Sequence, residues 1–256
     1  ATDTLTVVGV GSTIPTLVVK GGVGTQAGFV GIGSSDPQHG FDASTVKSAN
    51  VGAANSYINS TGSAILGGAT HQISGDFDVI AGGILASISG GNFNFIGGGS
   101  GIDITGSQYS SSLGGYNNDI IQSNQSVIGG GRDNLIKFSN GNTIGGGHTN
   151  NIFSGQQSYV GGGYQNMITG TVNSSAIVGG TDNEIHDTYS FIGAGATNVI
   201  YDGGQGSVIA GGAGNQISGT ASTVAGGIDN RLSGDYCFGM GYRAQVPNGI
   251  DGATVL

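Results

Sequence analysis

Apolar residues recur along most of the chain in a fixed relation to glycine and asparagine, at a spacing of 14 to 17 residues. An apolar residue precedes a glycine pair, an asparagine follows the pair, and an isoleucine comes two residues after the asparagine. The segment SVIGGGRDNLI, residues 126–136, is a complete copy. The second glycine of each pair marks about thirteen copies between residues 48 and 246: Gly52, Gly68, Gly83, Gly99, Gly115, Gly131, Gly147, Gly163, Gly180, Gly195, Gly212, Gly227 and Gly241.

This spacing is too short for a helical repeat or a propeller blade, and it matches one coil of a β-solenoid. Each coil would hold two short strands, each with one inward β-branched residue, joined by glycine-rich turns. Helix is excluded almost everywhere because each of the 55 glycines would cost about 1 kcal/mol in a helix interior. The pattern predicts an all-β, parallel solenoid, roughly 60 Å long at about 4.8 Å per coil.

The inward positions are predicted from the two recurring apolar residues. Those before the glycine pair are Ile65, Ile80, Ile96, Ile128, Ile144, Val160, Ile177, Ile192, Ile209, Val224 and Phe238. Those after the asparagine are Ile73, Ile88, Ile104, Ile120, Ile136, Ile152, Ile168, Ile185, Ile200, Ile217 and Leu232.

The recurring asparagine is interpreted as structural. Asparagine tolerates the left-handed backbone region, and identical side chains bond to one another along a stack. We expect a turn ladder formed by Asn118, Asn134, Asn150, Asn166, Asn183, Asn198, Asn215 and Asn230.

So thin a coil encloses little core, and oligomerisation is the usual remedy for a chain that buries too little by itself. The strings SVIGGGRDNLI and GDYCFGMGYRAQV (residues 234–246 for the second) resemble the head repeats of YadA-type trimeric autotransporter adhesins. A glycine–asparagine variant of this repeat is also similar to segments of phage tail fibres and large bacterial surface proteins. The resemblance implies a left-handed β-roll, a homotrimer and a role in attachment.

The first 50 residues lack the repeat. TLTVVGVGS and TLVVKGG alternate like strands, Pro15 marks a break, and FVGIGSSDPQHGFDAS resembles stretches between the shaft segments of tail fibres. Residues 1–50 are therefore interpreted as an N-terminal β cap or a junction to other fibre or tail components. Residues 51–246 form the predicted solenoid, and residues 247–256 a C-terminal tail.

Composition limits the environment and the partners. The net charge is −9, and the six basic residues are too few for a surface that tracks phosphates, so nucleic acid is not an expected partner. No apolar run is long enough for a membrane span. The single cysteine, Cys237, excludes an intrachain disulfide and is predicted to be a small buried residue. An acidic, glycine- and asparagine-rich β rod is typical of an extracellular or virion surface.

Catalysis and metal binding receive little support. Asp182, Glu184 and Asp187 fall in one coil, but carboxylates in turns commonly cap the backbone. GGSGIDITG, residues 98–106, starts like a calcium-binding nonapeptide without repeating as one, and His39, His71, His148 and His186 lack metal-ligand spacing. We therefore expect no enzyme activity, no cofactor and no metal. A polysaccharide-cleaving tailspike is the enzymatic alternative.

The residues directly after the glycine pairs vary from coil to coil. Because equal positions of successive coils stack, Tyr116, Arg132, His148 and Tyr164 should lie in line about 4.8 Å apart. Aromatic, basic and amide groups side by side are typical of sugar-binding and protein-binding surfaces. The alternatives are a solvated corner and a contact between chains.

The sequence favours a fibre segment for attachment, the receptor-binding or adhesive part of a phage tail fibre or bacterial surface adhesin. Its expected partners are a host surface glycan or protein receptor. A purely structural spacer or a self-assembling extracellular filament subunit is the alternative. An ice-binding solenoid would need a regular array of threonines, which the positions after the glycine pairs lack.

Overall fold

The computed structural model describes residues 4–8, 15–20, 29–31, 41–42, 49–51 and 55–256. The chain divides into two compact units, Ala1–Ala49 and Asn50–Leu256. All regular structure in the described residues is β, and these residues contain no helix that could span a membrane. Two residues named in the sequence analysis, His39 and Gly52, lie outside the described residues.

The N-terminal unit contains a four-stranded sheet in the order β1-β2-β3-β4. β2 pairs antiparallel with β1 and β3, and β3 pairs parallel with β4. Pro15, expected as a break, is the first residue of β2, a position where its missing N–H is tolerated. The strands are β1 (Thr4–Val8), β2 (Pro15–Lys20), β3 (Phe29–Gly31) and β4 (Phe41–Asp42).

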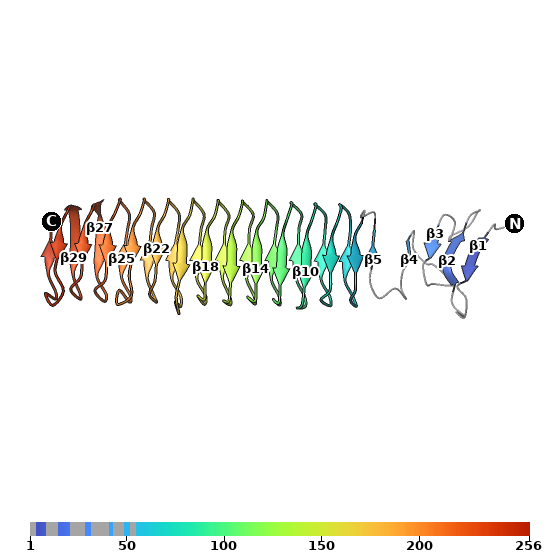
Figure 1. Cartoon of the computed structure of the whole chain (residues 1–256), viewed down its shortest axis with the longest axis horizontal. Helices are drawn as coiled ribbons and strands as arrows, with labels where there is room; N and C mark the ends of the chain where they lie inside the picture. Colours follow the sequence, from blue (N-terminus) through green and yellow to red (C-terminus); the bar gives the residue numbers. More distant parts are fainter. Residues whose placement is uncertain (1–3, 9–14, 21–28, 32–40, 43–48, 52–54) are drawn as a thin grey trace. The chain divides into compact units, whose positions relative to one another are not determined.

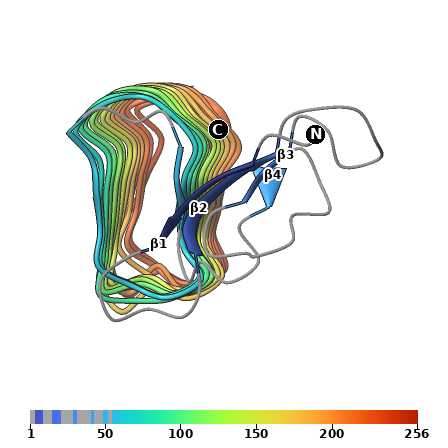
Figure 2. The ribbon, with the colours of Figure 1, turned by 90° about the vertical axis from the view of Figure 1, so that its right-hand side faces the viewer.

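The second unit is a parallel β-solenoid, as the repeat predicts (Figure 1). Its strands form a sheet of 13 even-numbered strands, β6 to β30, and a sheet of 14 odd-numbered strands, β5 to β31, called here the even and the odd sheet. Seen end-on, successive coils superpose (Figure 2).

The even sheet consists of β6 (Tyr57–Ile58), β8 (Gln72–Ile73), β10 (Ser87–Ser89), β12 (Asp103–Thr105), β14 (Asp119–Ile121), β16 (Leu135–Lys137), β18 (Asn151–Phe153), β20 (Met167–Thr169), β22 (Glu184–Ile185), β24 (Val199–Ile200), β26 (Gln216–Ile217), β28 (Arg231–Leu232) and β30 (Gln245–Val246). The odd sheet consists of β5 (Ala49–Asn50), β7 (Ala64–Ile65), β9 (Val79–Ile80), β11 (Phe95–Ile96), β13 (Ser111–Ser112), β15 (Val127–Ile128), β17 (Thr143–Ile144), β19 (Tyr159–Val160), β21 (Ala176–Ile177), β23 (Phe191–Ile192), β25 (Val208–Ile209), β27 (Thr223–Ile228), β29 (Phe238–Tyr242) and β31 (Thr254–Val255). The segment expected as a C-terminal tail thus adds β31 to the odd sheet, beside β29.

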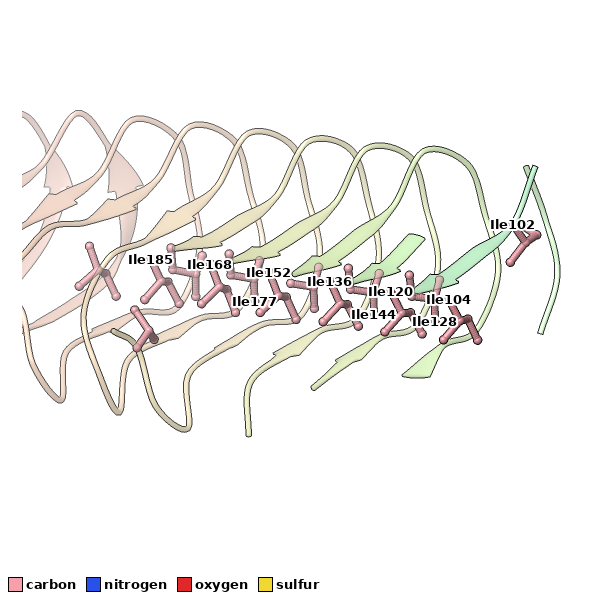
Figure 3. Close-up of a cluster of buried hydrophobic side chains, with 14 of the residues drawn as sticks. Ile102, Ile104, Ile120, Ile128, Ile136, Ile144, Ile152, Ile168, Ile177 and Ile185 are labelled. Carbon is pink, nitrogen blue, oxygen red and sulfur yellow. The ribbon is translucent and has the colours of Figure 1, made fainter. Parts of the chain in front are cut away.

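The core is a pair of isoleucine rows between the two sheets. In most strands an inward isoleucine lies in register with that of the next coil, as in Ile120↔Ile136 and Ile128↔Ile144. Ser112, Val160, Val224 and Leu232 take this place in other coils. These side chains are fully buried and point toward one another across the coil (Figure 3). Burying such a side chain contributes about 1.5–3 kcal/mol, so the rows are the main apolar stabilisation of each coil.

One predicted inward residue points outward. Phe238 pairs with the outward Thr223 and is partly exposed, and Gly239 takes the inward place beside Val224. The last spacing between repeats is 14 residues, and the register shifts between Val224 and Gly226. Counting back from the glycine pair therefore places the inward position one residue too early in this coil.

The asparagines form a continuous buried ladder. The backbone N–H of Asn150 donates to Oδ1 of Asn134 at 3.0 Å, and Oδ1 of Asn150 accepts in turn from the N–H of Asn166. Nδ2 of Asn150 donates to the carbonyl oxygens of Gly146 and Gly163 at 2.9 and 3.1 Å. Each asparagine therefore joins its own coil to the coils on both sides.

The left-handed corner falls one residue before each asparagine, not on the asparagine itself. Asp133 and Thr149, which precede Asn134 and Asn150, have φ values of 54° and 58°, whereas none of the eight ladder asparagines has a positive φ. The asparagines therefore serve the turn through their side-chain hydrogen bonds and not through a left-handed backbone. Gly131, two residues before the corner at Asp133, must be glycine. Its φ is 87°, and a Cβ there would collide with the carbonyl oxygen of Gly147.

A second buried ladder precedes each odd strand and is mostly serine. Its hydroxyls accept from the N–H of the next coil, as Ser110 does from Ser126, and donate to a carbonyl of the next coil, as Ser110 does to Ser123. Cys237 takes the place of serine here: its N–H donates to Oγ of Ser222 and its Sγ lies 3.3 Å from the carbonyl oxygen of Ile250. The cysteine is buried, but in a polar position.

Asp78 is the carboxyl member of the serine ladder. Its Oδ1 accepts from the N–H of Asn94 at 2.7 Å, while its buried Oδ2 has no partner. In the same ladder, Asn94 and Asn142 donate to carbonyl oxygens of the next coil. A carboxylate cannot do so, but a protonated carboxyl can. Burial raises the pKa of Asp78 to about 6, which favours the protonated form.

Replacing Asn150 by alanine should destabilise the solenoid by roughly 3 kcal/mol or more, because it leaves the N–H of Asn166 and two glycine carbonyls without their buried partner. Thermal melting followed by circular dichroism measures the change. Asn151→Ala, on the outward neighbour in β18, is the matched control. Equal melting temperatures for the two variants would contradict the structural role of the ladder.

Asp78→Asn should stabilise the protein at pH 7 and reduce its dependence on pH. The pKa of Asp78 is raised in the folded protein. Its contribution to the free energy of unfolding is therefore complete below the ordinary pKa near 3.8, and it is lost as the pH rises through about 6. Between low pH and pH well above 6, this contribution to the free energy of unfolding changes by at most roughly 3 kcal/mol. Melting temperatures at pH 5 and pH 7 test this, with Asp202→Asn, at an exposed position, as the control of equal charge change. An Asp78→Asn variant that melts no higher than the wild type at pH 7, with the same change in melting temperature between pH 5 and pH 7, would contradict the prediction.

Candidate binding surface

The coil geometry brings the four predicted surface residues into one line. Tyr116, Arg132, His148 and Tyr164 are joined coil to coil by successive parallel bridges. Each backbone N–H donates to the carbonyl oxygen of the second glycine in the next coil, as Arg132 does to Gly147 at 2.8 Å. Three coil steps of about 4.8 Å make this row, called here the Tyr116–Tyr164 row, about 14 Å long.

The side chains of the Tyr116–Tyr164 row contact one another in pairs while remaining accessible. The guanidinium carbon of Arg132 lies 5.5 Å from the ring centroid of Tyr116. The rings of His148 and Tyr164 meet edge to face with centroids 5.2 Å apart. Tyr116 is 52% exposed and Tyr164 42% exposed, and the Arg132 side chain is 62% exposed. The row is therefore a continuous, mixed aromatic and cationic strip.

Asp133, beside the row, orients its polar members. Its carboxylate accepts from Nδ2 of Asn117 and Nε of Arg132, both at 3.0 Å, and lies 3.5 Å from Nε2 of His148. The hydrogen bond from Asn117, followed by the contact with Arg132, holds the pKa of Asp133 below its ordinary value. The carboxylate is thus ionised at neutral pH, although ion pairs this exposed contribute little to stability.

A second aromatic row lies at another corner of the coil and was not predicted. Phe77, Phe93 and Tyr109 stack with ring centroids 5.1 Å apart and planes within 5° of parallel. All three have φ near +60°, where a bulky residue costs about 1–2 kcal/mol, and all are about half exposed. The stacking offsets part of this cost. Their spacing of sixteen residues was visible in the sequence, before the odd strands rather than after the glycine pairs.

The two sheets present opposite outer faces. No odd strand from β5 to β31 contains a charged residue, and large side chains such as Phe95, Leu113 and Tyr159 are exposed on this sheet. Within one coil, a large residue and a small residue lie two positions apart in the chain. Tyr159 lies against Gly161, and Leu113 comes two residues after Ser111. The even strands carry charged residues at Asp103, Asp119, Lys137, Glu184 and Arg231. The odd sheet thus has an uncharged, apolar outer face.

The clustered carboxylates considered for catalysis serve local structure. Asp187 accepts from the N–H groups of Thr188 and Gly203, at 2.7 and 2.8 Å. Glu184 pairs with His186 at 3.0 Å on the even sheet, and Asp182 occupies a left-handed corner with φ 53°. In the part of the chain that the structure describes, no three His, Cys, Asp or Glu side chains converge in a way that could hold a metal ion.

Comparison with known proteins adds no functional assignment. The chain matches no protein-family model and no curated protein sequence.

Proposed function

We propose that this chain is a non-enzymatic attachment segment of a fibre, on an extracellular or virion surface, and that the Tyr116–Tyr164 row contacts a glycan or protein receptor of the host. One observation carries the proposal: four bulky side chains of three chemical kinds lie in line on consecutive coils, accessible to solvent. Coil formation does not require them, because Ser100, Thr181 and Ala196 occupy the same place in other coils.

The chemistry of the row suits recognition of an extended partner. Tyrosine rings offer large contact area with little loss of conformational entropy, and they can stack on sugar rings. The guanidinium of Arg132 and the imidazole of His148 add directional hydrogen bonds between them. Exposed aromatic groups gathered on one surface are typical of interaction sites.

The proposal includes a homotrimer whose chains meet through the outer face of the odd sheet, with other fibre components joined at the N-terminal unit. Three features support this interface: the lack of charge in the odd strands, the exposed apolar side chains, and glycines that the isolated chain does not need. At Gly114 and Gly179 a Cβ would meet no atom within 4 Å, and neither φ is left-handed. Glycine at such places permits close approach by another backbone. The resemblance to trimeric adhesin heads agrees with this arrangement.

The double change Tyr116→Ala with Tyr164→Ala should abolish or weaken attachment at least tenfold while leaving assembly intact, because it removes two exposed rings and no core contact. Retention on a glycan array and on host cells measures attachment. Tyr189→Ala with Tyr236→Ala, two exposed tyrosines away from the row, is the matched control. Loss of the oligomer in the first variant would instead place the row between chains. Unchanged attachment and assembly would favour a spacer or filament subunit.

Sedimentation velocity should give a particle of three chains of 25.1 kDa. Leu113→Glu should dissociate it by placing a charge in the apolar face of the odd sheet. Leu135→Glu, on the outer side of the even sheet, should leave it assembled. A folded wild-type monomer would defeat the trimer, and equal dissociation by both variants would defeat the assignment of the face.

A further inference from the structure

The outer face of the even sheet is hollowed near its C-terminal end, far along the chain from the Tyr116–Tyr164 row. Tyr201, Gln216, Ser218, Arg231 and Ser233 line a cavity of about 290 Å³. The cavity forms because Tyr201 is followed, at the same place in the next two coils, by the small residues Ser218 and Ser233. Tyr201 is one wall and the two serines are the floor.

The wall and the floor offer complementary chemistry. The imidazole of His186 stacks on the Tyr201 ring, with centroids 6.2 Å apart and planes 8° from parallel. Because His186 belongs to the preceding coil, the other face of the ring is turned toward the serines. An aromatic face beside hydroxyl and amide groups is the combination that holds a sugar ring, with stacking on one side and hydrogen bonds to its hydroxyls on the other.

Arg231 gives the hollow a positive charge without a counter-ion. Its Nε and Nη2 both donate to Oε1 of Gln216, at 3.1 and 2.6 Å. No carboxylate among the described residues forms an ion pair with it. In a chain with net charge −9 and six basic residues, a guanidinium held by a neutral amide remains available for an added anion. Its planar fork fits a carboxylate through two parallel hydrogen bonds.

A second hollow continues the first on the other side of Arg231. It measures about 270 Å³ and shares Gln216 and Arg231 with the first; its other lining residues are Gly214, Asp229, Asn230, Arg243 and Gln245. Arg243 lies over the ring of Tyr242 at 4.8 Å and is only loosely paired with Asp229, at 3.7 Å. Two cationic side chains on adjacent coils thus border a pair of hollows, which suits a ligand of more than one unit.

We propose that these hollows bind an acidic saccharide, a chain of uronic-acid-type sugars. The carboxylate of one unit bonds to Arg231, its ring lies on Tyr201, and its hydroxyls bond to Ser218, Ser233 and Gln216. The next unit extends over the second hollow toward Arg243. This site is distinct from the Tyr116–Tyr164 row, and it does not depend on that row binding a receptor.

Isothermal titration of the assembled, full-length protein with trigalacturonic acid tests the site, with the trimethyl ester as the uncharged ligand of the same shape. Arg231→Gln should weaken binding of the acid at least tenfold, and Tyr201→Ala should weaken it severalfold. Lys137→Gln makes the same change of charge elsewhere on the even sheet, in β16, and should leave binding unchanged. The ester should bind at least tenfold more weakly than the acid.

Three results would overturn the proposal: no binding of the acid at millimolar concentration, equal binding of acid and ester, or equal losses from Arg231→Gln and Lys137→Gln. The last result would indicate general attraction of an anion to any basic side chain. Failure of this test leaves attachment through Tyr116 and Tyr164 untouched, because that function is measured with other variants. Circular dichroism of each variant establishes that it is folded.

Discussion

Hydrogen bonds between coils are the constraint on which the rest of the structure depends. All solenoid strands except β27 and β29 contain only two or three residues, so strand pairing alone gives most coils few bonds to their neighbours. The buried asparagine and serine ladders run from coil to coil beside the isoleucine rows and add side-chain bonds between coils, as Asn150 and Ser110 illustrate. Because a buried amide without a partner costs about 1–3 kcal/mol, a slip in register would break the whole ladder. The ladders thus fix one register along the solenoid.

A fixed register turns a linear repeat into straight surface rows. Residues at equal places in successive coils must lie about one strand spacing apart, whatever side chains they carry. Selection can then vary one row without disturbing the core: Tyr116 and Arg132 occupy a place that alanine or threonine takes elsewhere. The same rule produces the hollow at Arg231, where a tyrosine is followed by serines in the next two coils. Attachment chemistry and architecture are separable in such a fold.

Much of this architecture follows from the sequence because its signals are periodic. The isoleucine spacing predicts the parallel coils, and the glycine pairs predict the line from Tyr116 to Tyr164. Features that depend on side chains from several coils at once cannot be predicted from the repeat spacing. The raised pKa of Asp78 depends on its burial between coils, and the cavity at Arg231 depends on relative side-chain size in three coils. Phe238 was misplaced because one shortened repeat shifts the register locally.

Residue-resolved hydrogen exchange of backbone amides measures the ladders most directly. The amides of Asn134, Asn150 and Asn166 donate to side-chain oxygens of the preceding coil rather than to a strand. If the ladders fix the register, these amides should exchange as slowly as those of the neighbouring strands, such as Leu135 and Asn151. Exchange of the asparagine amides at rates typical of exposed turns, beside protected strands, would contradict the account.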